Sequence, residues 1–156
     1  MSLTQIISGG QTGVDRGALD AAIELGIHHG GVCPRGRLAE DGRIPNRYEL
    51  TELPSRKYSV RTEQNVIDSD ATLILYNGSL SGGTAFTHRM CIKNRRPFLL
   101  FDLTNPLEIE EFIDWLTENQ VSRLNCAGPR ESANPGIQNV TQGLCKELFV
   151  AALNHV

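Results

Sequence analysis

The chain has 156 residues, of which 40% are hydrophobic and 21% are charged, and its formal net charge at pH 7 is -3. These values are typical of one folded domain over residues 1–156, exclude a disordered chain, and argue against wholesale electrostatic binding of nucleic acid. No apolar run approaches the roughly 20 residues of a membrane helix, and the start MSLTQIIS lacks a signal-peptide pattern, so we expect a cytoplasmic protein.

The first half of the chain predicts two strands and two helices around a long polar loop. In chain order these are a strand over Leu3–Ser8, a helix of small residues that ends at Gly26, a strand over His29–Cys33, a loop over Arg35–Arg56, and a helix with Ser59 as its N-cap that runs to Asp68. A loop of this length inside a compact domain is typical of a functional loop or lid.

The second half predicts three strands and three helices. The segment ATLILY, Ala71–Tyr76, is apolar without alternation, which is typical of a central parallel strand covered on both faces. After it come a glycine-rich turn, a helix through Thr87 to Asn94, the strand PFLLFD, a helix that starts at Asn105-Pro106, the strand RLNCAG, and a helix from Ile137 to Ala152.

This alternation predicts an α/β fold with a doubly wound, mostly parallel five-stranded sheet and helices on both faces. Ligands of such folds bind beyond the carboxyl ends of the strands. Four of the five predicted strands end in small, hydroxyl-bearing or cationic residues, so we expect the ligand at this edge of the sheet.

Two glycine-rich loops are candidates for binding an anion such as phosphate. The first loop and the start of its helix supply Gly9, Gly10, Gln11, Thr12, Gly13, Asp15 and Arg16, and the second loop supplies Ser81, Gly82, Gly83 and Thr84. Free backbone N–H groups at a helix start can hold an anion. The alternative is that these glycines only make tight turns and close helix–sheet contacts. The first loop lacks the G-x-G-x-x-G fingerprint and the Lys and Ser/Thr of a P-loop, which argues against kinase or NTPase chemistry.

Charged residues near two other strand ends and on one predicted helix are further candidates for this site. Arg35 and Arg37 stand two apart in an irregular segment, where they would bind an oxyanion or pair with nearby acidic residues. Arg130 and Glu131 follow the last predicted strand, and a salt bridge is the simpler role for Glu131 because it has no visible partner for acid–base catalysis. Arg61 and Asn65 lie one helical turn apart on one face, where they would contact a ligand, or Arg61 would make a surface ion pair with Glu63 or Asp68.

The cysteines and histidines give no sign of a metal site. The four cysteines are widely spaced, and no C-x-x-C pair or histidine at zinc-ligand spacing occurs. Buried thiols in a reducing cytoplasm are the simpler interpretation.

Six segments in order resemble the molybdenum-cofactor carrier protein family. They are SGGQTGVDRGALDAA, CPRGRLAEDGRIP, RTEQNVIDSDATLIL, GGTAFT, RPFLLFDL and LNCAGPRESANPGI. The resemblance spans nearly the whole chain and implies a Rossmann-like fold within the superfamily of lysine-decarboxylase-like phosphoribohydrolases and DNA-processing protein A. It implies non-catalytic binding, storage or delivery of the molybdenum cofactor (molybdopterin), with a molybdoenzyme as recipient. The implied binding elements are residues 9–13, the loop around Arg35 and Arg37, and residues 82–84.

The related enzymes and DNA-binding proteins define two alternatives. The phosphoribohydrolases resemble P-G-G-x-G-T-x-x-E, whereas this chain has SGGTAFTHRM with His88 near the place of the carboxylate, which argues against cleavage of a nucleotide by that route. A hydrolase would have to use Asp15 or Glu131. The opening SGGQTGVD is similar to that of the DNA-processing group, but the negative charge and the 6% aromatic content argue against nucleic-acid binding. By analogy with other small doubly wound domains we expect a dimer or tetramer.

Overall fold

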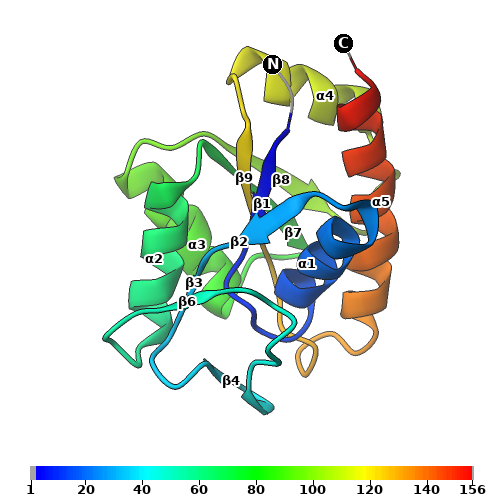
Figure 1. Cartoon of the computed structure of the whole chain (residues 1–156). Coiled ribbons are helices and arrows are strands. Elements are labelled where there is room, and N and C mark those ends of the chain that lie inside the picture. The colour runs from blue at the N-terminus through cyan, green and yellow to red at the C-terminus, as the bar shows by residue number, and fades with distance from the viewer. Residues whose placement is uncertain (1–2, 156) are drawn as a thin grey trace.

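The computed structural model of the protein describes residues 3–155 as alternating strands and helices around one central sheet (Figure 1). In chain order the elements are β1 (Gln5–Ile7), α1 (Val14–Leu25), β2 (His28–Gly30), β3 (Val32–Cys33), β4 (Leu38–Ala39), β5 (Gly42–Arg43), β6 (Thr51–Glu52), α2 (Tyr58–Asp68), β7 (Ala71–Tyr76), α3 (Gly82–Lys93), β8 (Phe98–Asp102), α4 (Ile109–Glu118), β9 (Arg123–Ala127) and α5 (Ile137–Asn154).

The central sheet has five parallel strands in the order β2-β1-β9-β7-β8. Because parallel crossovers are right-handed, α1 and α4 cover one face and α2 and α3 the other. The packing agrees, since α5 lies against α1 and α4, and α2 lies against α3. Figure 1 shows α1 and α5 to the right of the sheet and α2 and α3 to its left. The predicted doubly wound fold is confirmed.

The core divides between the two faces of the sheet. Along β7, Leu73 and Leu75 pack into a large cluster with α1, α4 and α5, whereas Ile74 packs with Val66 and Cys91 of α2 and α3. All three β7 residues are at most 1% exposed, as expected of a central strand covered on both sides.

Four local predictions differ from the structure, and one is the start of α4, which begins at Ile109 instead of Asn105-Pro106. The strand predicted over His29–Cys33 is interrupted at Gly31, whose φ of +129° breaks the strand, and β3 then pairs with β6 away from the main sheet. The predicted long loop contains the β4–β5 hairpin and β6. Helix α2 begins at Tyr58, with Lys57 at its N-cap, and the predicted cap Ser59 lies within the helix.

A small cluster, formed by Leu19, Cys33, Ala39, Ile44 and Tyr48, fixes the segment between β3 and β6 against α1. All of these side chains are buried. The segment is therefore packed against the rest of the fold.

Asp70 closes the amino end of the sheet, opposite the candidate site. Its carboxylate accepts hydrogen bonds from the Ser122 N–H at 3.0 Å, the Ser122 hydroxyl at 3.2 Å and the Arg123 N–H at 2.8 Å. Partial burial alone would raise the pKa of Asp70, but these hydrogen bonds outweigh it and hold the pKa below its usual value.

We expect Asp70→Ala to lower the free energy of unfolding by about 1–2 kcal/mol at neutral pH. Since the folded pKa lies below the unfolded one, the charged carboxylate stabilises the protein above the unfolded pKa, and this stabilisation is lost as the pH falls through the folded pKa. Urea denaturation at neutral pH and at about pH 2.5 measures the difference. An equal loss at both pH values would contradict a role for the charge.

Candidate ligand-binding site

A cleft of about 380 Å³ opens beyond the carboxyl ends of β7 and β9. The chain leaves β7 toward α3 on one face and leaves β9 toward α5 on the other, so these neighbouring strands diverge and leave a crevice. Residues from the loops after β1, β7 and β9 and from α2 line this cleft. This cleft therefore lies at the edge of the sheet that the sequence predicts for the ligand.

The start of α3 faces the cleft with unoccupied N–H groups. Gly82, Gly83 and Thr84 line the cavity, and α3 has no side-chain cap. Within residues 3–155 the amides of these three residues have no acceptor. A Cβ on Gly83 would meet nothing within 4 Å, and its φ is not positive, so the fold does not require glycine there. Such a helix start is suited to an anion.

Arg61 brings a buried guanidinium into the same cleft. Its side chain reaches from α2 to the end of β1, where Nη1 donates to the Gly9 carbonyl at 2.6 Å. Nη2 has no acceptor, and no carboxylate within residues 3–155 lies within 4 Å of the guanidinium. Burial lowers the pKa of Arg61, and the nearby charge of Asp15 opposes this effect. A buried cation without an ion pair favours an anionic ligand.

The approach of Arg61 explains the glycine at position 9. A Cβ on Gly9 would lie 2.6 Å from Nη1 of Arg61. The glycine therefore leaves room for the arginine.

Tyr58 and Arg130 stand beside Arg61. The guanidinium carbon of Arg61 lies 5.3 Å from the centre of the Tyr58 ring, and that of Arg130 lies 5.5 Å from it. Two cations on one aromatic ring indicate a part of the cleft with positive potential.

Among the described residues that line the cleft, Asp15 is the one with an acidic side chain. Its Oδ2 accepts a hydrogen bond from the Gln11 N–H at 3.2 Å. Burial raises the pKa of Asp15, although the charges of Arg61 and Arg16 and the hydrogen bond from Gln11 act in the opposite direction.

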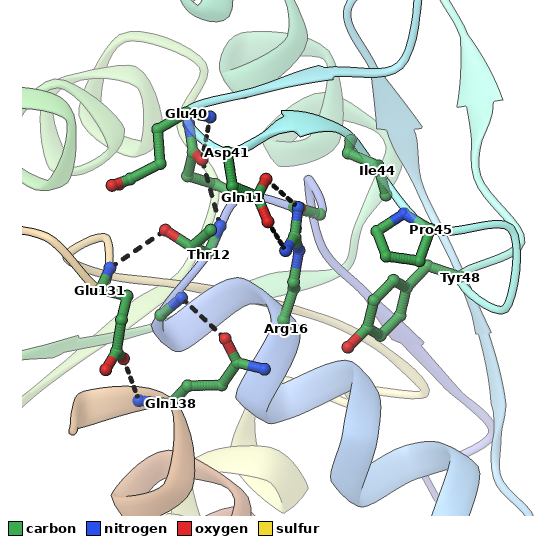
Figure 2. Close-up of polar contacts among 12 residues, drawn as sticks. Gln11, Thr12, Arg16, Glu40, Asp41, Ile44, Pro45, Tyr48, Glu131 and Gln138 are labelled. Carbon is green, nitrogen blue, oxygen red and sulfur yellow. Dashed lines mark hydrogen bonds and ion pairs between the residues drawn. The ribbon is translucent and has the colours of Figure 1, made fainter. Parts of the chain in front are cut away.

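The start of α1 differs from the expectation of free amides, as Figure 2 shows in part. The N–H groups of residues 11–14 donate, in order, to the Asp15 carboxylate, the Gln11 side-chain oxygen, the Gln138 side-chain oxygen and the Pro129 carbonyl. These N–H groups of α1 already have acceptors. The free N–H groups at the cleft are therefore those at the start of α3.

Two glycines of the first loop serve packing. Gly13 has a φ of +85°, and a Cβ there would lie 2.4 Å from the Pro129 carbonyl oxygen. Gly10 has a φ of +77°, and its Cβ would lie 2.6 Å from the side chain of Leu50. Neither residue lines the cleft.

Gln11 and Thr12 join this loop to its neighbours (Figure 2). The Gln11 side-chain oxygen also accepts from the Glu40 N–H at 2.9 Å, and Thr12 Oγ1 accepts from the Glu131 N–H at 3.1 Å. Gln11 lines the cleft, but its Nε2 is buried without an acceptor within residues 3–155.

Most of the other predicted charged residues lie outside the cleft lining. Arg16 makes a bidentate ion pair with Asp41 at 2.6 and 2.8 Å. The Glu131 carboxylate accepts from the Gly136 and Gln138 N–H groups at the start of α5. Arg35 is exposed.

Arg37 also lies away from the cleft, inside its own loop. Its guanidinium donates to four carbonyls at 2.7–3.3 Å, those of Ile44, Pro45, Tyr48 and Leu50. Of the predicted site residues, the cleft thus gathers Gly9, Gln11, Asp15, Ser81, Gly82, Gly83, Thr84 and Arg130.

The sequence places Arg61 and Asn65 on one helical face but does not decide between a ligand and a surface ion pair, and it does not single out Tyr58. Both Arg61 and Asn65 are buried and line the cleft. Asn65 is held by the backbone of Val32, whose N–H donates to Oδ1 at 2.8 Å and whose carbonyl accepts from Nδ2 at 3.0 Å. The spacing of one helical turn was the only sign in the sequence that Arg61 and Asn65 share a face. The contact of Asn65 with β3 determines that this face of α2 points to the cleft.

These features define a Rossmann-like protein with a small-molecule cleft at its topological switch point. The model of the circularly permutated YpsA SLOG family matches residues 6–149, and the chain belongs to this family. A solved structure from Syntrophus aciditrophicus SB, named as a candidate molybdenum carrier protein, is 46% identical over 96% of each chain, with a TM-score of 0.89. A search of curated proteins gives no significant match. The family resemblance seen in the sequence is confirmed.

The strand order shows the permutation directly. If β9, β1, β2, β7 and β8 are counted as the first to fifth strands, the observed order β2-β1-β9-β7-β8 becomes 3-2-1-4-5, which is that of the Rossmann sheet. The loop after β9, which carries Arg130, therefore takes the place of the first strand–helix loop of a Rossmann fold.

Within residues 3–155, no helix has the length and apolar character needed to cross a bilayer. The same residues contain no group of three or more histidine, cysteine, aspartate or glutamate side chains arranged to hold a metal ion.

Proposed function

We propose that this protein binds and carries a phosphorylated cofactor of the molybdopterin type. The observation that carries the proposal is that one cleft contains two sets of free donors. Among the described residues, they are the N–H groups of residues 82–84, which have no acceptor, and the Arg61 guanidinium, which has no ion pair. The 46% identical relative named as a candidate molybdenum carrier supports the choice of cargo.

The cleft residues fit such a cargo by their chemistry. The amides at the start of α3 and the guanidiniums of Arg61 and Arg130 would hold a phosphate and other anionic oxygens. Tyr58 supplies an aromatic surface beside these cations. The pterin and its metal would be cargo, since the family role implied by the resemblance is delivery.

Mass spectrometry of small molecules released from gently purified protein tests the proposal. We expect a stoichiometric phosphate-bearing pterin, and isothermal titration with the molybdenum cofactor would then give one site per chain. Failure of both the pterin and a panel of nucleotides to bind would overturn the proposal.

We expect Arg61→Met to weaken binding of the phosphorylated cofactor by about tenfold or more, because it removes a charge-assisted hydrogen-bond donor from the cleft. Arg35→Met is the matched control, since Arg35 is exposed and lies outside the cleft lining. Titration calorimetry of both variants, with thermal unfolding to verify folding, measures the difference. Equal affinities of the two folded variants would show that Arg61 does not contact the ligand.

The alternative of a nucleotide hydrolase requires acid–base groups in the cleft. Among the described residues of the lining, Asp15 is the one carboxylate, and Glu131 is bound to the start of α5. Hydrolysis of a nucleotide by the wild type, lost in Asp15→Asn, would favour the enzyme.

Three further expectations stay predictions: a molybdoenzyme as recipient, a symmetric dimer or tetramer, and a cytoplasmic location. Size-exclusion chromatography with light scattering measures the assembly.

A further inference from the structure

We propose that Asp15 is a specificity-determining residue, which accepts hydrogen bonds from the N–H edge of a 2-amino-4-oxo-pyrimidine ring, as found in pterins and guanine. This inference rests on the proposed function, because it places the ring of the cargo relative to its phosphate. The cleft would then have two recognition elements: the α3 amides with Arg61, which bind an anion, and the Asp15 carboxylate, which binds N–H donors.

The Asp15 carboxylate lies in the cleft with capacity to accept further hydrogen bonds. It is 8% exposed and lines the cavity, and Oδ2 accepts one hydrogen bond, from the Gln11 N–H at 3.2 Å. Within residues 3–155, no donor bonds Oδ1 and no cation lies within 4 Å of the carboxylate. The Ser8 hydroxyl has one proton to donate, either to the Cys126 carbonyl at 2.7 Å or to this carboxylate. A carboxylate can accept about four hydrogen bonds, so most of its capacity is open.

The fold does not explain why this residue carries a charge. The hydrogen bonds offered by the Gln11 N–H and the Ser8 hydroxyl would be accepted equally by the side-chain oxygen of asparagine. Burial makes the ionised form costly, and the arginines nearby do not offset this cost, because the pKa of Asp15 remains raised. A costly charge directed to a cleft is typical of a residue kept for its ligand.

The position of Asp15 suits one end of an elongated ligand. Asp15 follows β1 and the start of α3 follows β7, and β9 lies between these strands. Two strand spacings, about 10 Å, separate β1 from β7. Phosphorylated pterins and guanosine monophosphate carry their phosphate and their N–H edge at opposite ends, so one molecule would satisfy both elements.

The ring chemistry predicts an order of preference. The guanine and pterin edge presents an N–H and an adjacent NH₂, which a carboxylate accepts as a bidentate pair. Adenine presents one NH₂ beside a ring nitrogen that is itself an acceptor. Xanthine presents a carbonyl in place of the NH₂, and this oxygen would repel the carboxylate.

The test titrates the wild type and Asp15→Asn with inorganic phosphate, GMP, AMP and XMP. For the wild type we expect GMP to bind about tenfold more tightly than XMP, with AMP between them. For Asp15→Asn we expect the preference to turn toward XMP, since the new amide N–H₂ donates to the xanthine carbonyl. We expect inorganic phosphate to bind as tightly or more tightly to the variant, because a negative charge has left the cleft.

The outcomes separate this inference from the proposed function. If phosphate binds but Asp15→Asn leaves the GMP-to-XMP ratio unchanged, the inference is wrong and the phosphate site stands. If the variant loses phosphate and GMP equally, Asp15 has a structural role only, and the inference is also wrong. If the wild type binds none of these probes and no pterin, the proposed function and the inference both fall.

Thermal unfolding supplies a second readout, independent of any ligand. The charged groups that face Asp15 are Arg61 of α2 and Arg16 of α1, and the thiol of Cys126 lies near it at the end of β9. Because the folded pKa lies above the unfolded value of 3.8, the folded protein loses stability as the pH rises from 3.8 through the folded pKa.

An asparagine side chain is uncharged, like the protonated acid, so we expect Asp15→Asn to unfold at a higher temperature than the wild type at neutral pH. We expect the two midpoints to converge below pH 3.8, where the wild-type carboxyl is protonated in both states. A variant less stable than the wild type at neutral pH would show that the charge serves the fold.

Discussion

Replacing Arg37 with methionine lowers the free energy of unfolding by about 3 kcal/mol, the result expected when a buried hub of hydrogen bonds is removed. The Arg37 guanidinium donates to the carbonyls of Ile44, Pro45, Tyr48 and Leu50, and its side chain is buried. Methionine fills much of the same volume but donates none of these hydrogen bonds. Within residues 3–155 the Ile44 and Leu50 carbonyls then have no donor, whereas the Pro45 and Tyr48 carbonyls still accept from backbone N–H groups. Urea denaturation followed by circular dichroism measures the loss.

Two variants control this prediction. Arg35→Met removes a guanidinium from the same loop at an exposed position, and we expect it to change stability by less than about 0.5 kcal/mol. Arg37→Lys keeps the charge but not the planar fork, and we expect most of the loss to remain. A stable Arg37→Met protein that binds its ligand poorly would instead place Arg37 in ligand recognition, as the sequence suggested.

Arg37 and Arg61 show how far the sequence reaches into the site. Both are arginines in polar surroundings of the sequence, and both are buried in the structure. One satisfies carbonyls of its own loop, and the other faces the cleft from α2. No local pattern separates these roles, because each depends on segments that the fold brings near. The strand ends, by contrast, follow from the alternation of elements, so the edge of the sheet that holds the cleft was predictable.

The glycines of the two glycine-rich loops likewise have different roles that no local sequence pattern separates. Gly13 and Gly83 both precede or begin a helix after a strand, and the sequence treats them alike. In the structure a Cβ on Gly13 would collide with the loop after β9, whereas a Cβ on Gly83 would meet nothing within 4 Å. The permutation contributes to this difference. Because the chain begins at what is the second strand of a Rossmann sheet, its first glycine-rich loop does not occupy the switch point between β9 and β7.

We expect Gly13→Ala to lower the free energy of unfolding by at least about 3 kcal/mol. A methyl group at this position would lie 2.4 Å from the Pro129 carbonyl oxygen and 2.7 Å from backbone atoms of Arg130 and Glu131, and the φ of +85° is unfavourable for alanine. The loop after β9 would have to move away from α1. Denaturation in urea gives the stability, and calorimetry with the phosphorylated cofactor shows whether displacing Arg130 weakens binding.

Gly143→Ala is the matched substitution. Gly143 lies in the middle of α5, its Cβ would meet nothing within 4 Å, and its φ is not positive. Alanine there restricts the unfolded chain and favours the helix, so we expect a gain of about 0.5–1 kcal/mol and an unchanged affinity. The opposite signs of the two glycine-to-alanine changes follow from what each methyl group would touch. A Gly13→Ala protein as stable as the wild type would show that the loop after β9 yields easily, and the rigid contact between that loop and α1 would then not be what holds Arg130 at the cleft.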